Sequence, residues 1–439
     1  MVHQTISTNT ANAPRASKIN NHMIRLRIAP TGALLGALIL GGLLGGCATE
    51  PGASRPSAPA AALTVTPSTT ALPAPIPTPL MAPPVSTAGP AGPAASAWLR
   101  PRSRWVPVAW AELPDWESDR SVELWPALLR SCERPSSGWQ TLCVAAAALP
   151  PQNDEQTREW MQRHLKPYRV ESIEGASEGL ITGYFEPMIA AQRKPDARFK
   201  VPLYAPPADL ARRKPYWTRQ QIDTLPAAQD SLRGNEIAYV DDPLDALILQ
   251  IQGSGRLQII EPSGQRQWVR LAFAGHNDQP YKSVGRWLID QGEITPAQAS
   301  WPAIKAWAQR NPTRLQSMLW ANPRVVFFRE EALPNPQLGP KGAQAVPLTP
   351  GRSIAVDPQS IPYGTPIWLD TTEPLSNAPL RRIVMAQDTG AAIQGAVRAD
   401  YFWGWGDEAE QQAGRMKQPL RLWALWPRPA RGGKGGEAD

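Results

Sequence analysis

Residues 48–96 constrain the fold of this 439-residue chain more than any other stretch, because they cannot contribute to a packed core. The stretch is rich in Pro, Ala, Ser and Thr, has few charges and contains no aromatic residue. Such a composition buries too little apolar surface to offset the loss of chain entropy, so we expect a disordered, extended linker. Compact structure is therefore expected between about Trp98 and Trp426, with a disordered tail over 428–439.

The segment before this linker has the layout of an export signal. Arg25 and Arg27 precede an apolar run over 33–44, which is too short for a comfortable membrane span. The run ends in a Leu-Gly-Gly sequence before Cys47, which resembles the lipobox of bacterial lipoproteins. We expect residues 1–47 to form a lipoprotein signal peptide and Cys47 to carry the lipid. An ordinary secretory signal that happens to contain this cysteine is the alternative.

Composition argues against several classes of protein. The formal charge of +7 is modest and lies partly in the terminal segments, and no nucleic-acid-binding motif is present. The chain has no G-x-S-x-G elbow, phosphate loop, dinucleotide fingerprint or H-E-x-x-H motif. Four scattered histidines and three cysteines give no close ligand spacing, so we expect neither a metal nor a cofactor.

The cysteines and tryptophans predict how the interior of the folded part is stabilised. In an exported protein the isolated pair Cys132 and Cys143 indicates a disulfide, with two free buried thiols as the alternative. The 18 tryptophans lie almost wholly after residue 97. Each is expected in the core by default, although such rings can also stack on sugars.

Periodicity and turn signals predict a mainly β protein with some helices. Capping signals predict helices near 124–129, from Asn153 to about Leu165, and after Thr218, Thr295 and Asn311. Runs of β-type residues predict strands at 179–184, 247–256, 257–260, 268–273, 324–328, 353–356, 366–369, 383–386 and 420–425.

Three aspartates in the last β-rich block are candidates for chemistry. Asp388 ends an apolar run directly before the small loop 389–392, and Asp400 follows Gly395. A strand end is a rigid place to hold a carboxylate. Asp357 precedes a proline, as in many turns, so a structural role is its alternative.

Two polar loops and a glutamate are further candidates. Residues 250–255 offer amide and backbone donors that suit hydroxyl and acetamido groups, although an ordinary hairpin loop has the same composition. Residues 275–283 form a polar loop with an aromatic residue and a cation, and a solvated loop is the plain alternative. Glu186 ends a strand beside a proline and is a rival acid, although such a residue is more often structural.

Several motifs occur together in a fixed order, and the combination is more specific than its parts. They closely resemble the membrane-bound lytic murein transglycosylase A family with its C-terminal three-aspartate region, over about Trp98 to Trp426. The motifs are Gly183-Tyr-Phe-Glu-Pro187, Gln250-Ile-Gln-Gly-Ser-Gly-Arg256, Tyr281-Lys-Ser-Val-Gly285, Ala355-Val-Asp-Pro358 with Ile361-Pro-Tyr-Gly364, and Ala386-Gln-Asp-Thr-Gly390 with Arg398-Ala-Asp-Tyr-Phe-Trp-Gly404.

The chain departs from the family pattern in two loops. Ala391 stands where a second glycine is expected, and Asp278 stands where the family form Gly-x-Asn-Gly ends in glycine. Neither departure removes a carboxylate, so they bear on loop contacts rather than on the reaction.

The resemblance implies a fold of two β domains. It implies a double-psi β-barrel domain built from two separated segments, residues 97–190 and 336–427. A second β-barrel domain, residues 191–335, is inserted between them, and a long groove runs between the two domains.

The resemblance also implies a reaction. This is cleavage of the β-1,4 bond between N-acetylmuramic acid and N-acetylglucosamine, leaving a 1,6-anhydromuramic end. The catalytic set would be Asp400, Asp388 and Asp357, with Asp400 as acid because the barrel looks like that of barwin-type endoglucanases and expansins. The expected substrate-binding residues are Gly183, Tyr184, Gln252, Gly253, Ser254, Gly255, Tyr281, Thr389, Gly390 and Trp403.

The expected partners are peptidoglycan glycan strands and, through the lipid, the outer membrane of a Gram-negative bacterium. Ala48 favours the outer membrane, because an aspartate after the cysteine often retains lipoproteins in the inner membrane. A monomer that joins cell-wall synthesis complexes is expected, with no nucleic-acid partner. Two other hypotheses stay open: a glycan hydrolase on the same fold, and a non-catalytic peptidoglycan-binding lipoprotein.

Overall fold

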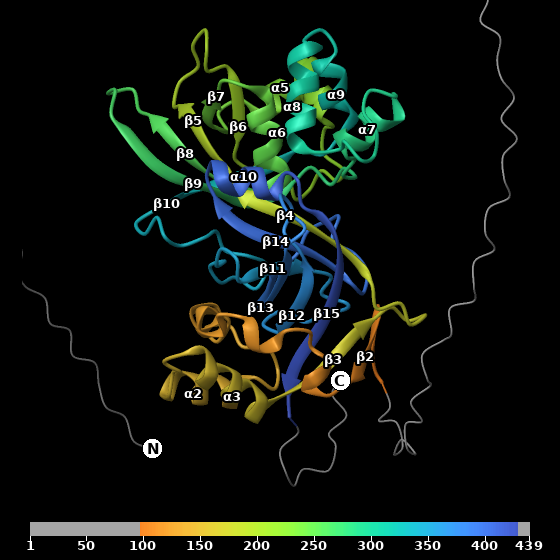
Figure 1. Ribbon diagram of the computed structural model, residues 1–439. Helices are drawn as coiled ribbons and strands as arrows, with labels where there is room; N and C mark the ends of the chain where they lie inside the picture. The colour runs from red at the N-terminus through yellow and green to blue at the C-terminus, as the bar shows by residue number, and fades with distance from the viewer. Residues whose placement is uncertain (1–96, 429–439) are drawn as a thin grey trace, which may run out of the picture. The chain divides into compact units, whose positions relative to one another are not determined.

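The computed structural model describes residues 97–428 of the chain. The predictions for the signal peptide, for Cys47, for the linker and for residues 429–439 lie outside the described residues. The described chain forms two sheets with short helices (Figure 1), which confirms the prediction of a mainly β protein with some helices. No helix in residues 97–428 is both long and apolar enough to cross a membrane.

Six strands close into a ring in the order β4, β14, β11, β13, β12 and β15, and β15 pairs back onto β4. The β14–β4 and β11–β13 pairings are parallel, and the other pairings in the ring are antiparallel. The ring strands are β4 (Gly179–Glu186), β11 (Ser353–Val356), β12 (Pro366–Thr372), β13 (Pro379–Asp388), β14 (Arg398–Trp405) and β15 (Lys417–Pro427).

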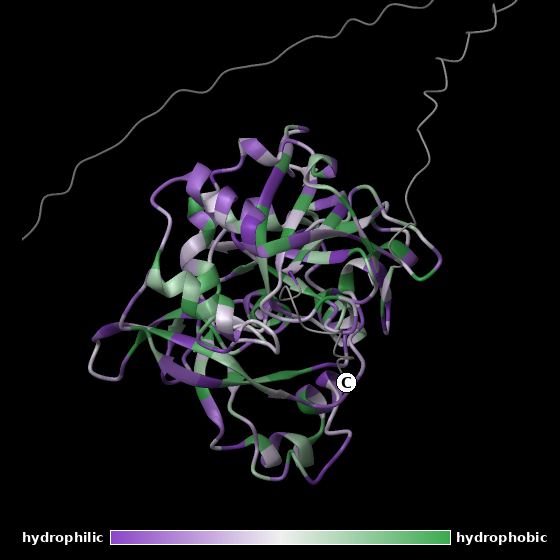
Figure 2. Ribbon diagram, turned by 90° about the horizontal axis from the view of Figure 1, so that it is seen from below, coloured by the Kyte–Doolittle hydropathy of each residue, from purple (hydrophilic) through white to green (hydrophobic). Residues whose placement is uncertain are grey.

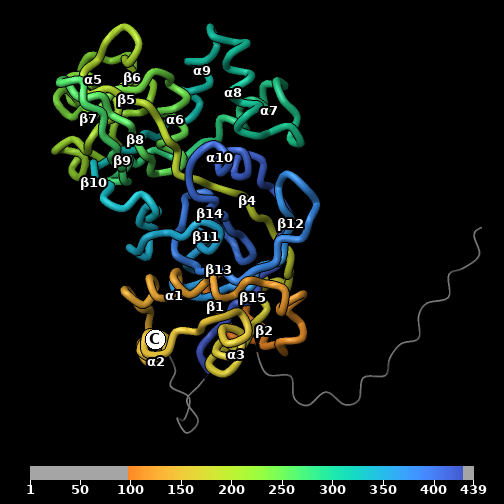
Figure 3. The backbone as a smooth tube through the Cα atoms, turned by 60° about the vertical axis from the view of Figure 1, so that its left-hand side comes forward, coloured from red at the N-terminus to blue at the C-terminus, as the bar shows by residue number. Residues whose placement is uncertain are grey.

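The ring combines distant parts of the chain. Strand β4 lies beside β14 in Figures 1 and 3, although more than two hundred residues separate them in sequence. The barrel is therefore discontinuous, as the family resemblance implies, while the domain boundaries at residues 190 and 335 stay predictions. Three more strands continue the sheet outward from β15: β3 (Leu165–Glu171), β2 (Ser103–Pro107) and β1 (Trp98–Arg100).

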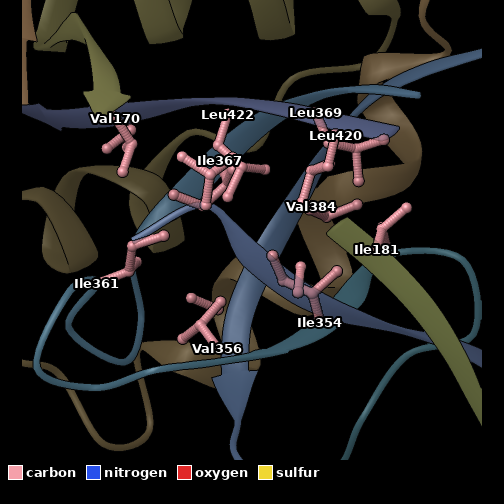
Figure 4. Packing of buried hydrophobic residues seen from close by; sticks show 14 of the residues in the cluster. Val170, Ile181, Ile354, Val356, Ile361, Ile367, Leu369, Val384, Leu420 and Leu422 are labelled. Carbon is pink, nitrogen blue, oxygen red and sulfur yellow. The ribbon is translucent and has the colours of Figure 1, made fainter. Parts of the chain in front are cut away.

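Alternating β-branched and aliphatic residues fill the barrel, because successive side chains of a strand point to opposite faces. Figure 4 shows side chains from five of the ring strands and from β3 converging on one interior. Ile354, Ile367, Leu369, Val384 and Leu422 there are fully buried. This core fixes the strand register, and the register positions the polar residues at the strand ends.

The outer face of the same strands packs against helices. Trp368 on β12 and Trp423 on β15 join a second core with Trp125, Trp139 and Trp160. Their burial agrees with the expectation that tryptophan lies in the core by default. The helices before β3 are η1 (Trp110–Glu112), η2 (Trp116–Ser118), η3 (Ser121–Leu124), α1 (Trp125–Ser131), α2 (Gln140–Ala148) and α3 (Asp154–His164).

A second sheet has six strands in the order β10, β9, β8, β5, β7 and β6. The two end strands also contact each other, so the sheet curves toward a barrel. Apolar (green) and polar (purple) segments alternate along the chain in Figure 2. The strands are β5 (Met188–Gln192), β6 (Val201–Tyr204), β7 (Glu236–Val240), β8 (Ser254–Ile260), β9 (Arg266–His276) and β10 (Val326–Ala332).

The remaining helices lie between these strands, except α10, which follows β14. The side chain of Thr218 caps α4 through a complete capping box with Gln221, as its sequence predicts. The helices are α4 (Arg219–Thr224), α5 (Pro226–Leu232), α6 (Pro243–Gln252), α7 (Val284–Asp290), α8 (Trp301–Arg310), α9 (Leu315–Ala321) and α10 (Asp407–Ala413).

The strand predicted at 247–256 is wrong over most of its length, because α6 covers these residues up to Gln252. The Asp242 side chain caps the helix, Pro243 occupies its first turn, and Gly253 ends it at φ 80°. Leu244, Leu247 and Ile248 then bury one helical face. A short apolar run is compatible with the residue spacing of a helix and with that of a strand. Here the capping residues favour the helix.

Two helix starts predicted from capping signals also differ from the structure. The backbone and hydroxyl of Thr295 donate to Gln298, but they close only a turn, and α8 begins after Ser300. Asn311 likewise opens a turn, and α9 starts at Leu315. A side-chain cap therefore marks a turn here without the buried apolar face that continues a helix.

A disulfide joins Cys132 and Cys143, with an S–S distance of 2.04 Å, and links the end of α1 to α2. Both helices pack on the outer face of the barrel strands. The bridge therefore ties together the layer that covers β12, β13 and β15.

Candidate active site

Asp400 lies on β14, where the parallel register sets it opposite Thr182 of β4. The Thr182 hydroxyl donates to Asp400 Oδ1 at 2.6 Å. Arg398 lies two residues before Asp400, hence on the same face of the strand, and its Nη2 donates to the Thr182 hydroxyl at 2.9 Å. Three polar groups are thus fixed by backbone pairing rather than by a mobile loop.

The Asp400 carboxyl is suited to hold a proton near neutral pH. Burial raises its pKa from 3.8 to about 6, because the anion loses hydration. The Thr182 hydrogen bond and the Arg398 charge oppose this rise, and the charge of Asp388 adds to it. Asp400 Oδ2 accepts no hydrogen bond from any residue in 97–428, so it is the oxygen available to a ligand.

Asp388 ends β13 and is held from two sides. Its Oδ1 accepts from the backbone N–H of Ala343 at 2.9 Å, and its Oδ2 accepts from the Tyr184 hydroxyl at 3.0 Å. Burial raises the pKa of Asp388, and burial together with the Asp388 and Asp400 charges raises the pKa of Tyr184 well above its usual value. Two of the predicted site residues, Asp388 and Tyr184, therefore form one hydrogen-bonded pair close to Asp400.

Asp357 is a buried turn residue with both oxygens engaged. Its Oδ1 accepts from the backbone N–H of Gln359 at 2.9 Å. Its Oδ2 accepts from Gly395 N at 2.8 Å and pairs with Arg102 at 3.0 Å. The carboxylate thus holds the loop that leads into β14, which matches the structural alternative for this residue.

The predicted binding residues on the barrel divide into two groups. Thr389 is exposed beside Asp388, with its hydroxyl donating to the Val356 carbonyl at 2.8 Å, and Gly390 follows it. Gly183 instead lies against the Trp403 ring, since a Cβ at Gly183 would meet Trp403 Nε1 at 2.8 Å. Gly183 and Trp403 are therefore packing residues in this structure.

The residues predicted from the Gln-Gly-Ser-Gly motif have structural roles at the end of α6 and the start of β8, and they do not form a binding loop. The Gln252 side chain accepts from Phe185 N at 3.1 Å, and Gly253 caps α6. Ser254 opens β8 opposite Ala272. Gly255 is closely packed, because a Cβ there would meet Leu249 Cδ1 at 2.2 Å and the Pro187 carbonyl oxygen at 3.2 Å.

Glu186, the rival acid, is the centre of a buried ionic cluster. Its Oε2 pairs with Arg256 at 2.7 Å, and its Oε1 pairs with Arg270. Both guanidiniums also donate to the Leu338 carbonyl. The fully buried Glu186 thereby ties β4 to β8, β9 and the segment that returns to the barrel, and it presents no free oxygen to a ligand.

Thr182 and Arg398 are site residues that we did not predict. Thr182 lies outside the quoted motifs, and Arg398 begins one of them without a role assigned to it. Their contact with Asp400 depends on pairing β4 with β14. The available signal was the spacing Arg398-x-Asp400, which places a cation and a carboxyl on one face of a strand. Within residues 97–428, no group of three or more His, Cys, Asp and Glu side chains is arranged to hold a metal ion.

Two family models match the chain. An MltA-specific insert domain matches residues 180–329, and a 3D domain matches residues 352–426. The membrane-bound lytic murein transglycosylase A of Vibrio cholerae is 32% identical over 287 residues, which cover 62% of this chain and 74% of that protein. The Escherichia coli protein of the same name is 29% identical over 282 residues, covering 63% of this chain and 73% of its own.

Solved structures agree with these matches. A lytic transglycosylase of Burkholderia pseudomallei, LtgG, has 44% sequence identity and a TM-score of 0.53, covering 74% of this chain and 96% of its own. MltA from Neisseria gonorrhoeae has 31% identity and a TM-score of 0.64, and the match covers 78% of this chain and 97% of the Neisseria chain. Fold and relatives together define a lytic transglycosylase. More particularly, the chain belongs to the membrane-bound lytic murein transglycosylase A family.

Proposed function

We propose that this enzyme cleaves the β-1,4 bond between N-acetylmuramic acid and N-acetylglucosamine and leaves a 1,6-anhydromuramic end, with Asp400 as its single acid and base. The observation that carries the proposal is the Asp400 carboxyl itself. It is half-buried, its pKa is raised to about 6, and one of its oxygens is free of hydrogen bonds from residues 97–428. A general acid works best when its pKa lies near the working pH.

In this mechanism, protonated Asp400 donates to the glycosidic oxygen as positive charge develops at the muramyl C1. The resulting carboxylate then removes the proton from the muramyl 6-hydroxyl, whose oxygen bonds to C1. No water enters, so the products together have the composition of the substrate. The Thr182 hydroxyl and the Arg398 guanidinium stabilise the Asp400 anion between the two proton transfers.

The hydrolase hypothesis requires a second carboxylate that activates water. Asp388 is the nearest candidate by sequence, but each of its oxygens already accepts a hydrogen bond from Ala343 or Tyr184. Asp357 and Glu186 are engaged in ion pairs. This arrangement supports a reaction with one carboxyl, in which Asp388 orients the site through Tyr184 and adds negative charge beside Asp400.

Digestion of isolated sacculi with the purified full chain tests the proposal. Turbidity should fall while the number of ends that borohydride can reduce stays constant, because an anhydro end has no free aldehyde. Release of one reducible end for each cut would instead show a hydrolase. Retention of the chain on sacculi without any cutting would favour the binding lipoprotein.

The pH dependence of kcat/KM is expected to show the Asp400 pKa. Because the acid must be protonated, activity should be full below pH 6 and fall as pH rises through about 6. Thr182→Val removes the hydrogen bond that stabilises the anion, so the falling limb should move to higher pH. A pH–rate profile of both enzymes measures this shift. A limb at the same pH in both enzymes would contradict a role of this hydrogen bond in setting the Asp400 pKa. The matched control is Thr371→Val on β12 of the same barrel, which removes a hydroxyl that donates to the Pro419 carbonyl at 2.7 Å and should leave the limb where it is.

We infer further that Cys47 carries the lipid that attaches the enzyme to the outer membrane, supported by its lipobox sequence and by relatives named membrane-bound. Cells fed radioactive palmitate should label the wild-type chain, and Cys47→Ser should abolish the label. The matched control Cys132→Ser should keep it. Equal labelling of the wild type and Cys47→Ser would refute the anchor.

A further inference from the structure

Three loops in the segment between β6 and β10 are held together by the buried side chain of Asn277. Its Nδ2 donates to the carbonyls of Trp217 and Pro323, each at 2.8 Å, and its Oδ1 accepts from Val325 N at 3.0 Å. The Gln279 side chain adds a hydrogen bond to the Tyr216 carbonyl at 2.8 Å. Residues 213–217, 276–282 and 322–325 therefore form one unit, here named the Asn277 loop cluster.

The Asn277 loop cluster carries four cations: Arg213, Lys214, Lys282 and Arg324. None of the four pairs with an acid in the part of the chain that the structure describes. Arg213 stacks on the Trp217 ring with 3.7 Å between its guanidinium carbon and the ring centroid. Arg324 donates through Nε to the Gln279 carbonyl at 2.8 Å, and its two Nη atoms make no hydrogen bond within residues 97–428.

The acids near this cluster are fewer than its cations. Asp278, within the cluster, is exposed, with its backbone at φ 58° and its N–H donating to His276 Nδ1 at 2.9 Å. Asp209 lies on the chain just before Arg213, and its carbonyl accepts from the Arg213 N–H. The cluster therefore keeps an excess of positive charge at a fixed place.

The same cluster borders the candidate active site. Val284, three residues after Tyr281, packs in one core with Phe185 of β4, and Trp403 of β14 contacts that core. Burial raises the pKa of the Tyr281 phenol, and the charge of Asp400 adds to this rise. A hydrogen bond with Ser283 and the charge of Arg324 oppose it. Tyr281 is thus close enough to feel the charges of both Asp400 and Arg324.

We propose that the Asn277 loop cluster binds the carboxylates of the peptide stems on the glycan strand that Asp400 cuts. The proposal rests on the proposed function. A stem is attached to the lactyl group of a muramic acid residue, so a strand bound at Asp400 brings carboxylates close to the site. Guanidinium and ammonium groups held beside a site recognise carboxylates, and Arg324 has its Nη atoms free for such a contact.

Carboxylates on a glycan strand have two sources, and two substrates separate them. Stem-bearing strands present peptide carboxylates, whereas strands stripped by an amidase present only the lactyl carboxylate. The test compares the full chain with its Lys214→Gln/Lys282→Gln variant on both. Both lysines are exposed, so the variant should unfold at the same temperature as the wild type.

On stem-bearing strands we expect the kcat/KM of the variant to fall roughly two- to tenfold, through KM, because each exposed charge contributes modestly. On stripped strands the two enzymes should be equal. The matched control is Lys194→Gln/Lys200→Gln, which removes two exposed lysines at the opposite end of β9, roughly 30 Å away. This control should cut both substrates like the wild type.

Equal loss on both substrates would overturn the proposal, because the cations would then bind the glycan itself. Equal activity of variant and wild type on stem-bearing strands would overturn it as well. A wild-type chain that cuts neither substrate would instead refute the proposed function, and the proposal with it. The wild-type result therefore distinguishes the two failures.

Discussion

Replacing Asp400 with asparagine is expected to reduce the release of muropeptides from sacculi by about a thousandfold or more. The amide cannot give a proton to the glycosidic oxygen or take one from the 6-hydroxyl, and one positioned acid or base contributes about 10² to 10⁴. Binding to sacculi should persist, because the side chain keeps its shape and its contact with Thr182. Initial rates and pull-down on insoluble peptidoglycan measure the two properties.

The same variant is expected to be more stable than the wild type at pH 8. The folded-state pKa of Asp400 is about 6 against a reference of 3.8, so the folded protein loses stability as pH rises between these values. Asparagine removes this loss of stability, which the pKa difference sets at about 3 kcal/mol. The measured gain should be smaller, because Arg398 loses its counter-charge in the variant. Urea unfolding at pH 8 and at pH 4 should show the gain only at pH 8.

The matched control is Asp370→Asn on β12 of the same barrel. Asp370 is nearly buried and pairs with Arg381 and Arg421, so its loss should lower stability while turnover by the folded enzyme continues. Near-normal turnover by Asp400→Asn would eliminate Asp400 as the acid. Equal loss of turnover in both variants would show that the effect is structural.

Glu186→Gln is expected to lower the free energy of unfolding by about 3–5 kcal/mol, because it leaves Arg256 and Arg270 as buried charges without their anion. The folded fraction should retain its kcat, since Glu186 lies in the ionic cluster and not at a free position beside Asp400. Urea titrations, with activity measured per folded molecule, test both expectations.

Glu171→Gln provides the comparison for this variant. Glu171 is also buried and also meets two arginines, Arg104 and Arg169, but these are partly exposed, so a smaller loss of stability is expected. A Glu186→Gln protein that stays folded but loses its activity more than a hundredfold would make Glu186 the acid instead of Asp400.

Local sequence signals predicted the parts of this fold that depend on local contacts. The Asn153 cap starts α3, the Thr218 capping box starts α4, and the strand predicted at 353–356 has the bounds of β11. Each of these depends on residues within a few positions of one another. The strand predicted at 247–256 was wrong, because a short apolar run does not distinguish the residue spacing of a helix from that of a strand.

The candidate site could be predicted only in part for the same physical reason. Asp400 and Asp388 were found by motif, and Asp388 ends its strand as expected, whereas Asp400 lies within β14. Thr182 and Arg398 become site residues only when β4 pairs in parallel with β14, a register that the whole barrel core selects. Local sequence patterns contain no information about that pairing. The family resemblance predicted the barrel, but it did not predict the contacts of Thr182 with Asp400 and with Arg398.

Mass spectrometry of the muropeptides that the purified full chain releases from sacculi tests the central claim most directly. The account predicts products lighter by one water than those of a muramidase, present with the wild type and absent with Asp400→Asn. Products of full hydrolytic mass, or lighter products that persist in Asp400→Asn, would contradict it.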